Sequence, residues 1–149
     1  MKKILLMLFL GVLFLDLYAP QNGVLTIVRS SPIQYVSIND VKDMLIEFKV
    51  QHYKIVLAQI RLESGNLTSF LCRENKNLLG MKFPVRRKTT AIGSDHGYAV
   101  YSNYRDCIKD MALWQESSYK KGNNGDYILH LVNTYAEDPQ YIKKLMKMI

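Results

Sequence analysis

Apolar residues recur at helical spacing over most of the chain that follows residue 36. Val41, Leu45 and Phe48 follow one another at intervals of three or four positions, which places them on one face of a helix. Ser37 or Asn39 stands at the start of this stretch, and both are residue types that cap helices. The pattern predicts a helix that begins near residue 37 and buries one side.

The next stretch, residues 54–65, has the same spacing. Ile55, Ala58 and Leu62 lie along one side of it. Gly65 closes the segment, and glycine commonly ends helices because it adopts the left-handed conformation without strain. We therefore expect a second helix that ends just before Gly65.

Further helical patterns follow along the chain. Residues 68–76 predict a short helical turn, residues 103–120 a long helix and residues 126–135 another helix. The last segment restarts with Asp138 as the cap and Pro139 at the first helical position, an order that helix starts favour.

Residues 77–102 have a different character. Pro84, Gly93 and Gly97 interrupt this region, and the residues YAVYS at 98–102 alternate as a strand does. No other part of the chain looks β-like. The predicted fold class is α+β, mainly α: a helical domain with one small β-hairpin lobe near its middle.

The amino terminus has a pattern of its own. Two lysines precede a run of 12 apolar residues, 4–15, and such a run is typical of secretory signals but short for a transmembrane helix, which needs roughly 20. A cut after Ala19 would be poor because Pro20 would follow it. We interpret residues 1–19 as a signal peptide or an uncleaved amino-terminal anchor. The protein is then exported to the periplasm, the cell envelope or the extracellular space.

Composition limits the remaining possibilities. The chain has 149 residues, of which 48% are hydrophobic and 22% charged, and this excludes disordered and low-complexity classes. We expect a linker or extended arm at 20–36 and one domain at 37–149. The formal net charge is +7, and only one of these charges comes from the leader. Such an excess suits an anionic partner: nucleic acid, anionic lipid or an acidic wall polymer.

The spacing of histidine and cysteine argues against a metal site. His52, His96 and His130 are far apart, and no HExxH or CxxC pattern occurs. The chain also lacks a glycine-rich phosphate loop and the GxSxG motif. We expect an activity that needs neither metal nor cofactor. The basic run 86–88 is either a solvated hairpin tip or a surface that binds an anionic polymer.

Two cysteines flank the β-like region. In an oxidising compartment Cys72 and Cys107 can form a disulfide that closes a loop of about 35 residues and contributes roughly 3–4 kcal/mol. The alternative is a pair of buried free thiols. Both remain open at this point, because sequence does not give the distance between the two Cα atoms.

Glu63 stands out among the acidic residues. It lies near the carboxyl end of an apolar helical segment, where the helix dipole disfavours negative charge and partial burial raises a carboxyl pKa further. Both effects suit a general acid that keeps its proton near neutral pH. The alternative is an exposed glutamate paired with Arg61 or Arg73.

Four blocks of sequence carry a resemblance to a known family. They are AQIRLESGNLTS (58–69), NKNLLGMK (75–82), YAVYSNY (98–104) and NTYAEDPQYIKKL (133–145). In this order they resemble the bacterial glucosaminidases of glycoside hydrolase family 73, which are peptidoglycan hydrolases found among autolysins, flagellar wall-cutting proteins and phage lysins. The resemblance implies a lysozyme-like fold, with helices around a cleft and a small β-lobe facing them.

The resemblance also implies an activity and a site. Glu63 matches the family's acid catalyst, and the bond cut is GlcNAc-β-1,4-MurNAc, which makes the protein an endo-β-N-acetylglucosaminidase. Gln59, one helical turn earlier, would orient Glu63 or make a polar contact within the core. Substrate binding is assigned to Gln59, Asn77, Leu79, Gly80, Lys82, Tyr98 and Tyr135.

The second catalytic group is harder to assign. A direct hydrolase needs a group that activates water or stabilises the oxocarbenium ion. Asp95 is the only acid between Phe83 and Tyr104, so we nominate it, although aspartate is also favoured in turns. If Asp95 does not serve, the acetamido group of the substrate can act as nucleophile and Tyr101 can assist. Retention and inversion of configuration both remain open.

Two departures from the family pattern and three rival functions complete the picture. Asn66 and Leu67 replace the small and aromatic pair after ESG, and Glu137 replaces the threonine of YATDP. The rivals are a muramidase, a lytic transglycosylase and a non-catalytic glycan-binding or assembly protein. For all of them we expect peptidoglycan glycan strands as the partner, no nucleic acid, membrane contact only through an uncleaved leader, and a monomer.

Overall fold

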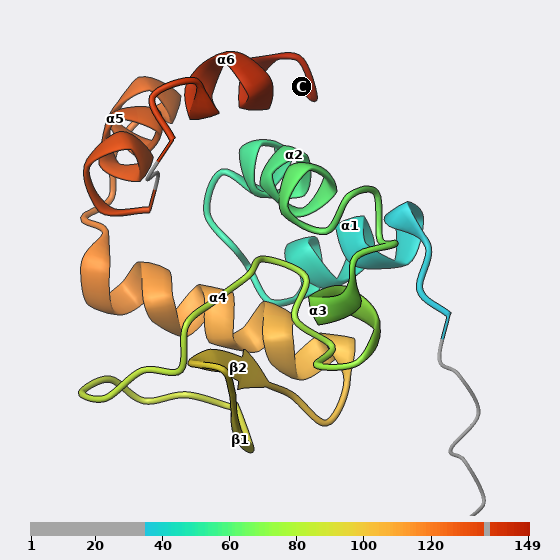
Figure 1. Cartoon of the computed structure of the whole chain (residues 1–149). Coiled ribbons are helices and arrows are strands. Elements are labelled where there is room, and N and C mark those ends of the chain that lie inside the picture. Colours follow the sequence, from blue (N-terminus) through green and yellow to red (C-terminus); the bar gives the residue numbers. More distant parts are fainter. Residues whose placement is uncertain (1–34, 136–137) are drawn as a thin grey trace, which may run out of the picture. The chain divides into compact units, whose positions relative to one another are not determined.

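Six helices and one two-stranded sheet make up the described part of the chain, which comprises residues 35–135 and 138–149 of a computed structural model (Figure 1). The predicted leader and nearly all of the predicted linker lie outside the described residues, as does Glu137. The elements in order are α1 (Ile38–Glu47), α2 (Tyr53–Glu63), α3 (Phe70–Arg73), β1 (Gly93–Asp95), β2 (Tyr98–Val100), α4 (Tyr104–Ser118), α5 (Asn124–Thr134) and α6 (Tyr141–Met146). The α+β class, mainly α, is confirmed.

Helix α1 begins with a reciprocal cap. The Ser37 side chain accepts from the Asp40 backbone N–H, and the Asp40 carboxylate accepts from the Ser37 backbone N–H at 2.8 Å. Of the two capping residues that the sequence offers, Ser37 is the one used. Val41 and Leu45 are buried on the inner face, as their spacing predicts.

The end of α2 fixes the position of Glu63, which is the last residue of the helix. Gly65 follows with φ +57, and the N–H groups of Gly65 and Asn66 bond the carbonyls of Leu62 and Arg61. These two bonds form a Schellman motif, which uses carbonyls that the helix leaves free. The predicted end of the helix is therefore confirmed.

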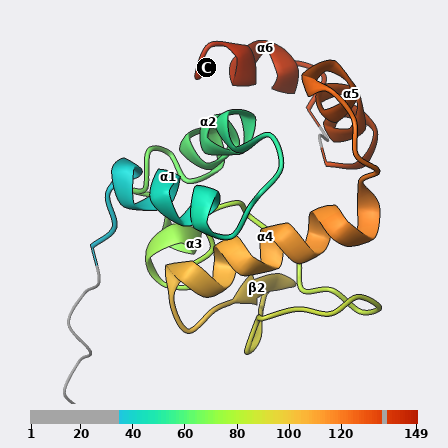
Figure 2. The same cartoon turned by 180° about the vertical axis from the view of Figure 1, so that it is seen from behind.

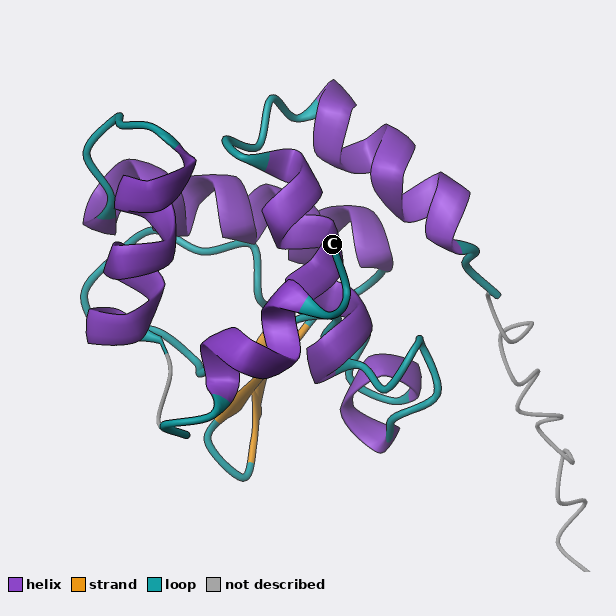
Figure 3. Ribbon diagram, turned by 90° about the horizontal axis from the view of Figure 1, so that it is seen from above, coloured by secondary structure: helices purple, strands orange, loops and turns teal. Residues whose placement is uncertain are grey.

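The hairpin forms around a two-residue turn. His96 and Gly97 both have positive φ, 47 and 83, as a type I′ turn requires. Asp95 pairs with Tyr98, and Gly93 pairs with Val100. The rest of residues 77–102 is mainly loop, so the strands are shorter than the β-like region of the sequence. In Figure 3 the hairpin lies at the edge of the helical body.

Helix α4 carries much of the core. Cys107, Ile108 and Met111 are fully buried on it, and it runs the length of the helical body in the rear view (Figure 2). Helix α2 packs against both α1 and α6. Cys72 and Cys107 are free thiols, and both are buried. Of the described helices, none combines the length and the apolar character that a membrane span requires.

The start of α6 differs from the prediction. The helix begins at Tyr141 rather than at Pro139, because residues 138–140 form a tighter turn in which the Tyr141 N–H bonds the Asp138 carbonyl at 2.9 Å. Asp138 still acts as a cap for that turn. Its carboxylate accepts from the Gln140 N–H at 2.8 Å and from Lys144 Nζ at 2.6 Å.

Candidate functional site

A cleft of about 570 Å³ opens beside the carboxyl end of α2. It is bordered by that helix end, the loop between α3 and β1, strand β2, the middle of α4 and the segment that leads into α6. The lining residues are Glu63, Leu71, Leu79, Gly80, Met81, Lys82, Phe83, Pro84, Arg87, Tyr98, Trp114, Thr134, Tyr135, Asp138 and Tyr141.

Glu63 is half-buried in this cleft. Burial raises the pKa of its carboxyl, and an interaction with the Tyr141 hydroxyl opposes that rise without cancelling it. Among the described residues, no ion pair joins Glu63 to Arg61. Arg61 instead donates to the Asn66 side chain and to the Met148 carbonyl, both at 3.3 Å. Burial therefore favours the protonated form of Glu63. Among the described residues Glu63 forms no ion pair with Arg73 either, so the alternative of a surface ion pair is wrong.

Asn77 organises the loop that forms one wall of the cleft. It is buried, its side-chain nitrogen donates to the carbonyls of Met81 and Ala99 at 2.9 and 3.0 Å, and its oxygen accepts from the Met81 N–H at 2.9 Å. Asn77 is not among the cleft-lining residues. This placement gives it a structural role in place of the predicted substrate contact.

Gly80 lies in the same loop, directly beside the catalytic candidate. Its φ is +62, and a Cβ added to it would lie 3.8 Å from Glu63 Oε2. A side chain here would be strained and would fill the space next to the carboxyl group. Leu79, Gly80 and Lys82 all line the cleft, as the sequence predicts.

Two tyrosines and a tryptophan form the opposite side. The Tyr135 hydroxyl donates to the Leu79 carbonyl, and its ring meets the Trp114 ring edge to face, with centroids 5.7 Å apart. Tyr141 lies next to Tyr135, with ring centroids 6.3 Å apart. Tyr135 was predicted from the resemblance. Tyr141 belongs to the same block, and its match to the family pattern was the signal that could have identified it.

The β-lobe side of the cleft combines a cation with an aromatic ring. Lys82 Nζ lies 3.6 Å from the centroid of the Tyr98 ring, and a β-bridge joins the two residues. This cation–π pair keeps a positive charge and an apolar ring face together at the cleft wall. Both are predicted substrate-binding residues.

Tyr101 does not reach the cleft. It is only 2% exposed, and its hydroxyl donates to Asp110 Oδ2 at 2.7 Å. Arg87 bonds both oxygens of Asp110, at 2.6 and 2.9 Å. Burial raises the pKa of the Tyr101 hydroxyl. Tyr101 therefore ties the β-lobe to α4, and this placement does not fit the assisting role predicted for it.

Asp95 also lies outside the cleft. It ends β1, and its carboxylate contacts His96 Nδ1 at 2.7 Å and Asn75 Nδ2 at 3.4 Å. The structure does not bring Asp95 into one pocket with Glu63. The other carboxyl group that lines the cleft is Asp138. Its hydrogen bonds with Lys144 and the Gln140 N–H lower the pKa of Asp138 below its ordinary value.

A family model described as mannosyl-glycoprotein endo-beta-N-acetylglucosaminidase, and named Glucosaminidase, matches residues 38–149. The chain belongs to this family. The match covers every described helix and strand and includes Glu63 and the whole cleft. It confirms the resemblance on which the sequence analysis relied.

Two solved structures resemble this chain. The catalytic domain of the autolysin Auto from Listeria monocytogenes is 26% identical, with a TM-score of 0.55 over 75% of this chain and 80% of that one. A type VI secretion system effector–immunity complex from Pseudomonas protegens is 15% identical, with a TM-score of 0.60 over 74% of this chain and 85% of that one. The second likeness shows a shared fold only. No curated protein matches the chain.

Gln59 reaches Glu63 only through another residue. It is fully buried, and its amide nitrogen donates to the Tyr141 hydroxyl at 3.2 Å. Its amide oxygen accepts from the Tyr127 hydroxyl at 3.3 Å. Gln59 therefore makes polar contacts in the core of the domain and does not line the cleft.

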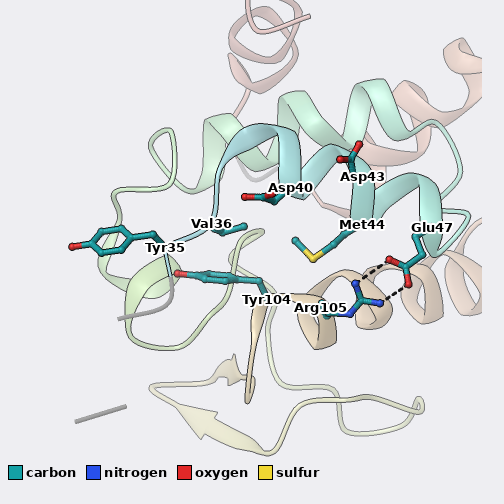
Figure 4. A pocket seen from close by; sticks show the side chains of 8 residues that line it. All are labelled: Tyr35, Val36, Asp40, Asp43, Met44, Glu47, Tyr104 and Arg105. Atoms are coloured by element: carbon teal, nitrogen blue, oxygen red, sulfur yellow. Dashed lines mark hydrogen bonds and ion pairs between the residues drawn. The ribbon is translucent and has the colours of Figure 1, made fainter. Parts of the chain in front are cut away.

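A second groove, of about 300 Å³, lies between α1 and α4 (Figure 4). Two of its three acids are engaged: Asp40 caps α1, and Glu47 forms a two-pronged ion pair with Arg105, while the third, Asp43, is exposed. These hydrogen bonds lower the pKa of both carboxyl groups. The groove therefore offers no acid of the kind that Glu63 provides. Within residues 35–135 and 138–149, no cluster of His, Cys, Asp and Glu is placed to hold a metal ion.

Proposed function

We propose that this glucosaminidase is an exported peptidoglycan hydrolase that cleaves the GlcNAc-β-1,4-MurNAc bond with Glu63 as the general acid. The observation that carries the proposal is a half-buried carboxyl group in an open cleft, with a raised pKa and without a cationic partner among the described residues. The family and the likeness to an autolysin catalytic domain support peptidoglycan as the substrate.

The remaining cleft residues suit a glycan of negative charge. Tyr98 and Trp114 present aromatic rings that stack on sugar faces, and Lys82 and Arg87 supply positive charge for the lactyl-peptide carboxylates. Arg87 is already paired with Asp110, so Lys82 is the cation with more freedom to meet substrate.

For the second catalytic group, we propose the acetamido group of the substrate. Its carbonyl oxygen attacks the anomeric carbon as the glycosidic oxygen leaves with the proton from Glu63. Water then opens the cyclised intermediate and returns a proton to Glu63, so the configuration is retained. The position of Asp95 outside the cleft and the engagement of Asp138 by Lys144 and Gln140 support this route over a second carboxylate.

Digestion of purified peptidoglycan tests the proposal directly. Products are reduced with borohydride and identified by mass spectrometry. New N-acetylglucosaminitol ends are expected. Muramitol ends would indicate a muramidase, and 1,6-anhydro ends a lytic transglycosylase. Binding without cleavage at any pH would identify a non-catalytic glycan-binding protein.

Export is a separate proposal, because residues 1–19 lie outside the described part of the chain. A carboxy-terminal reporter fusion is expected beyond the cytoplasmic membrane. Amino-terminal sequencing of the mature protein then decides between a cut after Ala19 and an uncleaved anchor. A reporter confined to the cytoplasm would contradict export.

A further inference from the structure

A continuous row of buried polar side chains crosses the core from α4 to the cleft. Each member hydrogen-bonds the next, and all are between 0 and 7% exposed. We call this row the relay; it consists of Gln115, Tyr127, Gln59 and Tyr141 in that order, and it ends at the cleft that Tyr141 and Glu63 both line.

The backbone of Gln51 sets the direction of the relay. Its N–H donates to Gln115 Oε1 at 2.8 Å, and a main-chain N–H can only donate. Gln115 Oε1 is therefore the acceptor, and Nε2 points the other way. Nε2 donates to the Gln51 carbonyl at 2.9 Å and to the Tyr127 hydroxyl oxygen at 3.1 Å.

The same direction continues to the cleft. The Tyr127 hydroxyl accepts from Gln115, so its single proton goes to Gln59 Oε1 at 3.3 Å. Gln59 then has only its amide nitrogen for the next link, and it donates to the Tyr141 hydroxyl at 3.2 Å. The proton of Tyr141 is then free, and the Glu63 carboxyl lines the same cleft as Tyr141.

We propose that Gln59 is a positioning residue that, together with Tyr127 and Gln115, holds Tyr141 as a one-way hydrogen-bond donor to Glu63. This rests on the proposed function, in which Glu63 is the general acid. The carbonyl oxygen of a protonated carboxyl group is its stronger acceptor, so donation from Tyr141 to one oxygen favours the acid proton on the other. The relay in this way favours one protonation site of Glu63 and opposes the effect of burial on its acidity.

Few titratable side chains surround Glu63 among the described residues. Tyr135 and Tyr141 face it from the carboxy-terminal segment, and the other titratable side chains of the cleft are Lys82, Arg87, Tyr98 and Asp138. Burial raises the pKa of Glu63, and the donation from Tyr141 is the interaction that opposes it. If the relay is cut, Gln59 can turn over and Tyr141 can donate to it instead. The pKa of Glu63 then rises further.

The chain offers a matched pair of variants. Tyr127→Phe removes one hydroxyl from the relay. Tyr119→Phe removes one from a ring that packs edge to face against Tyr127, 5.0 Å away, and that bonds His52 outside the relay. Tyr141→Phe removes the donor itself, at the cleft, and serves if the first variant does not fold.

The experiment is a carbon-13 NMR titration of the Glu63 carboxyl in the free, full-length protein, assigned by its loss in Glu63→Gln. Tyr141→Phe is expected to raise the midpoint by about 1 pH unit and Tyr127→Phe by about 0.5, since hydrogen bonds to charged groups are worth this much or more. Tyr119→Phe is expected to leave it unchanged.

A folded Tyr127→Phe protein that titrates as the wild type would overturn the relay, and so would an equal shift in Tyr119→Phe. The titration needs no catalysis. A shift in a protein that fails to cleave peptidoglycan would leave the relay standing and reject the proposed function alone.

Discussion

Glu63 and Asp110 are both carboxyl groups at least partly removed from water, and their surroundings shift their pKa values in opposite directions. Asp110 is fully buried, and burial would raise its pKa, but Arg87 and Tyr101 donate to its oxygens and hold the pKa below its ordinary value. Glu63 faces the Tyr141 hydroxyl and no guanidinium, and its pKa is raised. The first carboxylate holds two parts of the fold together. Burial favours the protonated form of the second, at the edge of a cleft.

The difference lies in the partner rather than in the depth of burial. A cation within hydrogen-bond distance offsets the free-energy cost of desolvating a carboxylate, whereas a single neutral hydroxyl offsets only part of that cost. The chain places Arg87 on Asp110 at the junction of the β-lobe with α4, whereas Arg61, in the last turn of α2, donates to Asn66 and Met148 rather than to Glu63. Under the proposed function, this difference gives stability at one site and reactivity at the other.

The largest test of this contrast is Glu63→Gln. The amide keeps the shape of the side chain but has no transferable proton, so activity on peptidoglycan is expected to fall by about 10²–10⁴-fold. Release of reducing ends gives the rate, and circular dichroism checks the fold. Wild-type activity in a folded Glu63→Gln variant would reject Glu63 as the acid.

The matching test at the other site is Asp110→Asn. It removes one partner of a buried ion pair and leaves Arg87 without a counter-charge, which typically costs about 3 kcal/mol of unfolding free energy. Urea denaturation measures the loss. In the wild type this contribution is present above the unfolded-state pKa of aspartate, about 4, and disappears as pH falls through the lower folded-state value. An unchanged midpoint would show that the pair does not hold the lobe.

Gly80→Ala sharpens the comparison at the cleft. The new methyl group would require a strained positive φ and would lie 3.8 Å from Glu63 Oε2. We expect a loss of about 1 kcal/mol in stability together with reduced activity. The control is Gly93→Ala, where φ is ordinary and a Cβ meets nothing within 4 Å. Equal effects of Gly80→Ala and Gly93→Ala on stability and activity would show that Gly80 has no special role.

The raised pKa of Glu63 also predicts a pH-dependent cost to stability. Between the unfolded-state pKa of glutamate and the higher folded-state value, the native protein binds more protons than the unfolded chain, so stability falls as pH rises. Glu63→Gln removes this dependence. The free energy of unfolding of the variant is expected to rise relative to that of the wild type as pH increases to neutrality. In acid this relative gain in stability is expected to disappear. Thermal unfolding across this range tests it, and a gap between the two proteins that stays constant with pH would contradict it.

The smallest effect is expected from Asp95→Asn. The residue lies in the hairpin turn region, outside the cleft, and asparagine also suits turns. Activity should change far less than in Glu63→Gln, and a thiazoline mimic of the cyclised intermediate should inhibit the wild type. A loss as large as that of Glu63→Gln, with partial rescue by azide, would make Asp95 the base.

Local patterns were enough to predict most elements of this protein. The cap at Ser37, the stop at Gly65 and the strand near Tyr98 depend on residues only a few positions apart, so the sequence alone predicts them. The same holds for the position of Glu63 at the end of a helix. The exception is α6, where the Asp138–Pro139 signal is local but the chain makes a tighter turn before the helix begins at Tyr141.

Contacts between distant residues depended on the folded chain. Tyr101 and Tyr135 are both aromatic residues in matched blocks, yet one is buried against Asp110 and the other lines the cleft. Gln59 and Tyr141 are 82 positions apart, and nothing in their local sequence says that they meet. Helix periodicity and capping act over one or two turns, whereas the partner of a buried polar group is chosen by how whole elements pack. The position of Glu63 at the end of a helix was therefore predictable from the sequence, and the groups that surround its carboxyl were not.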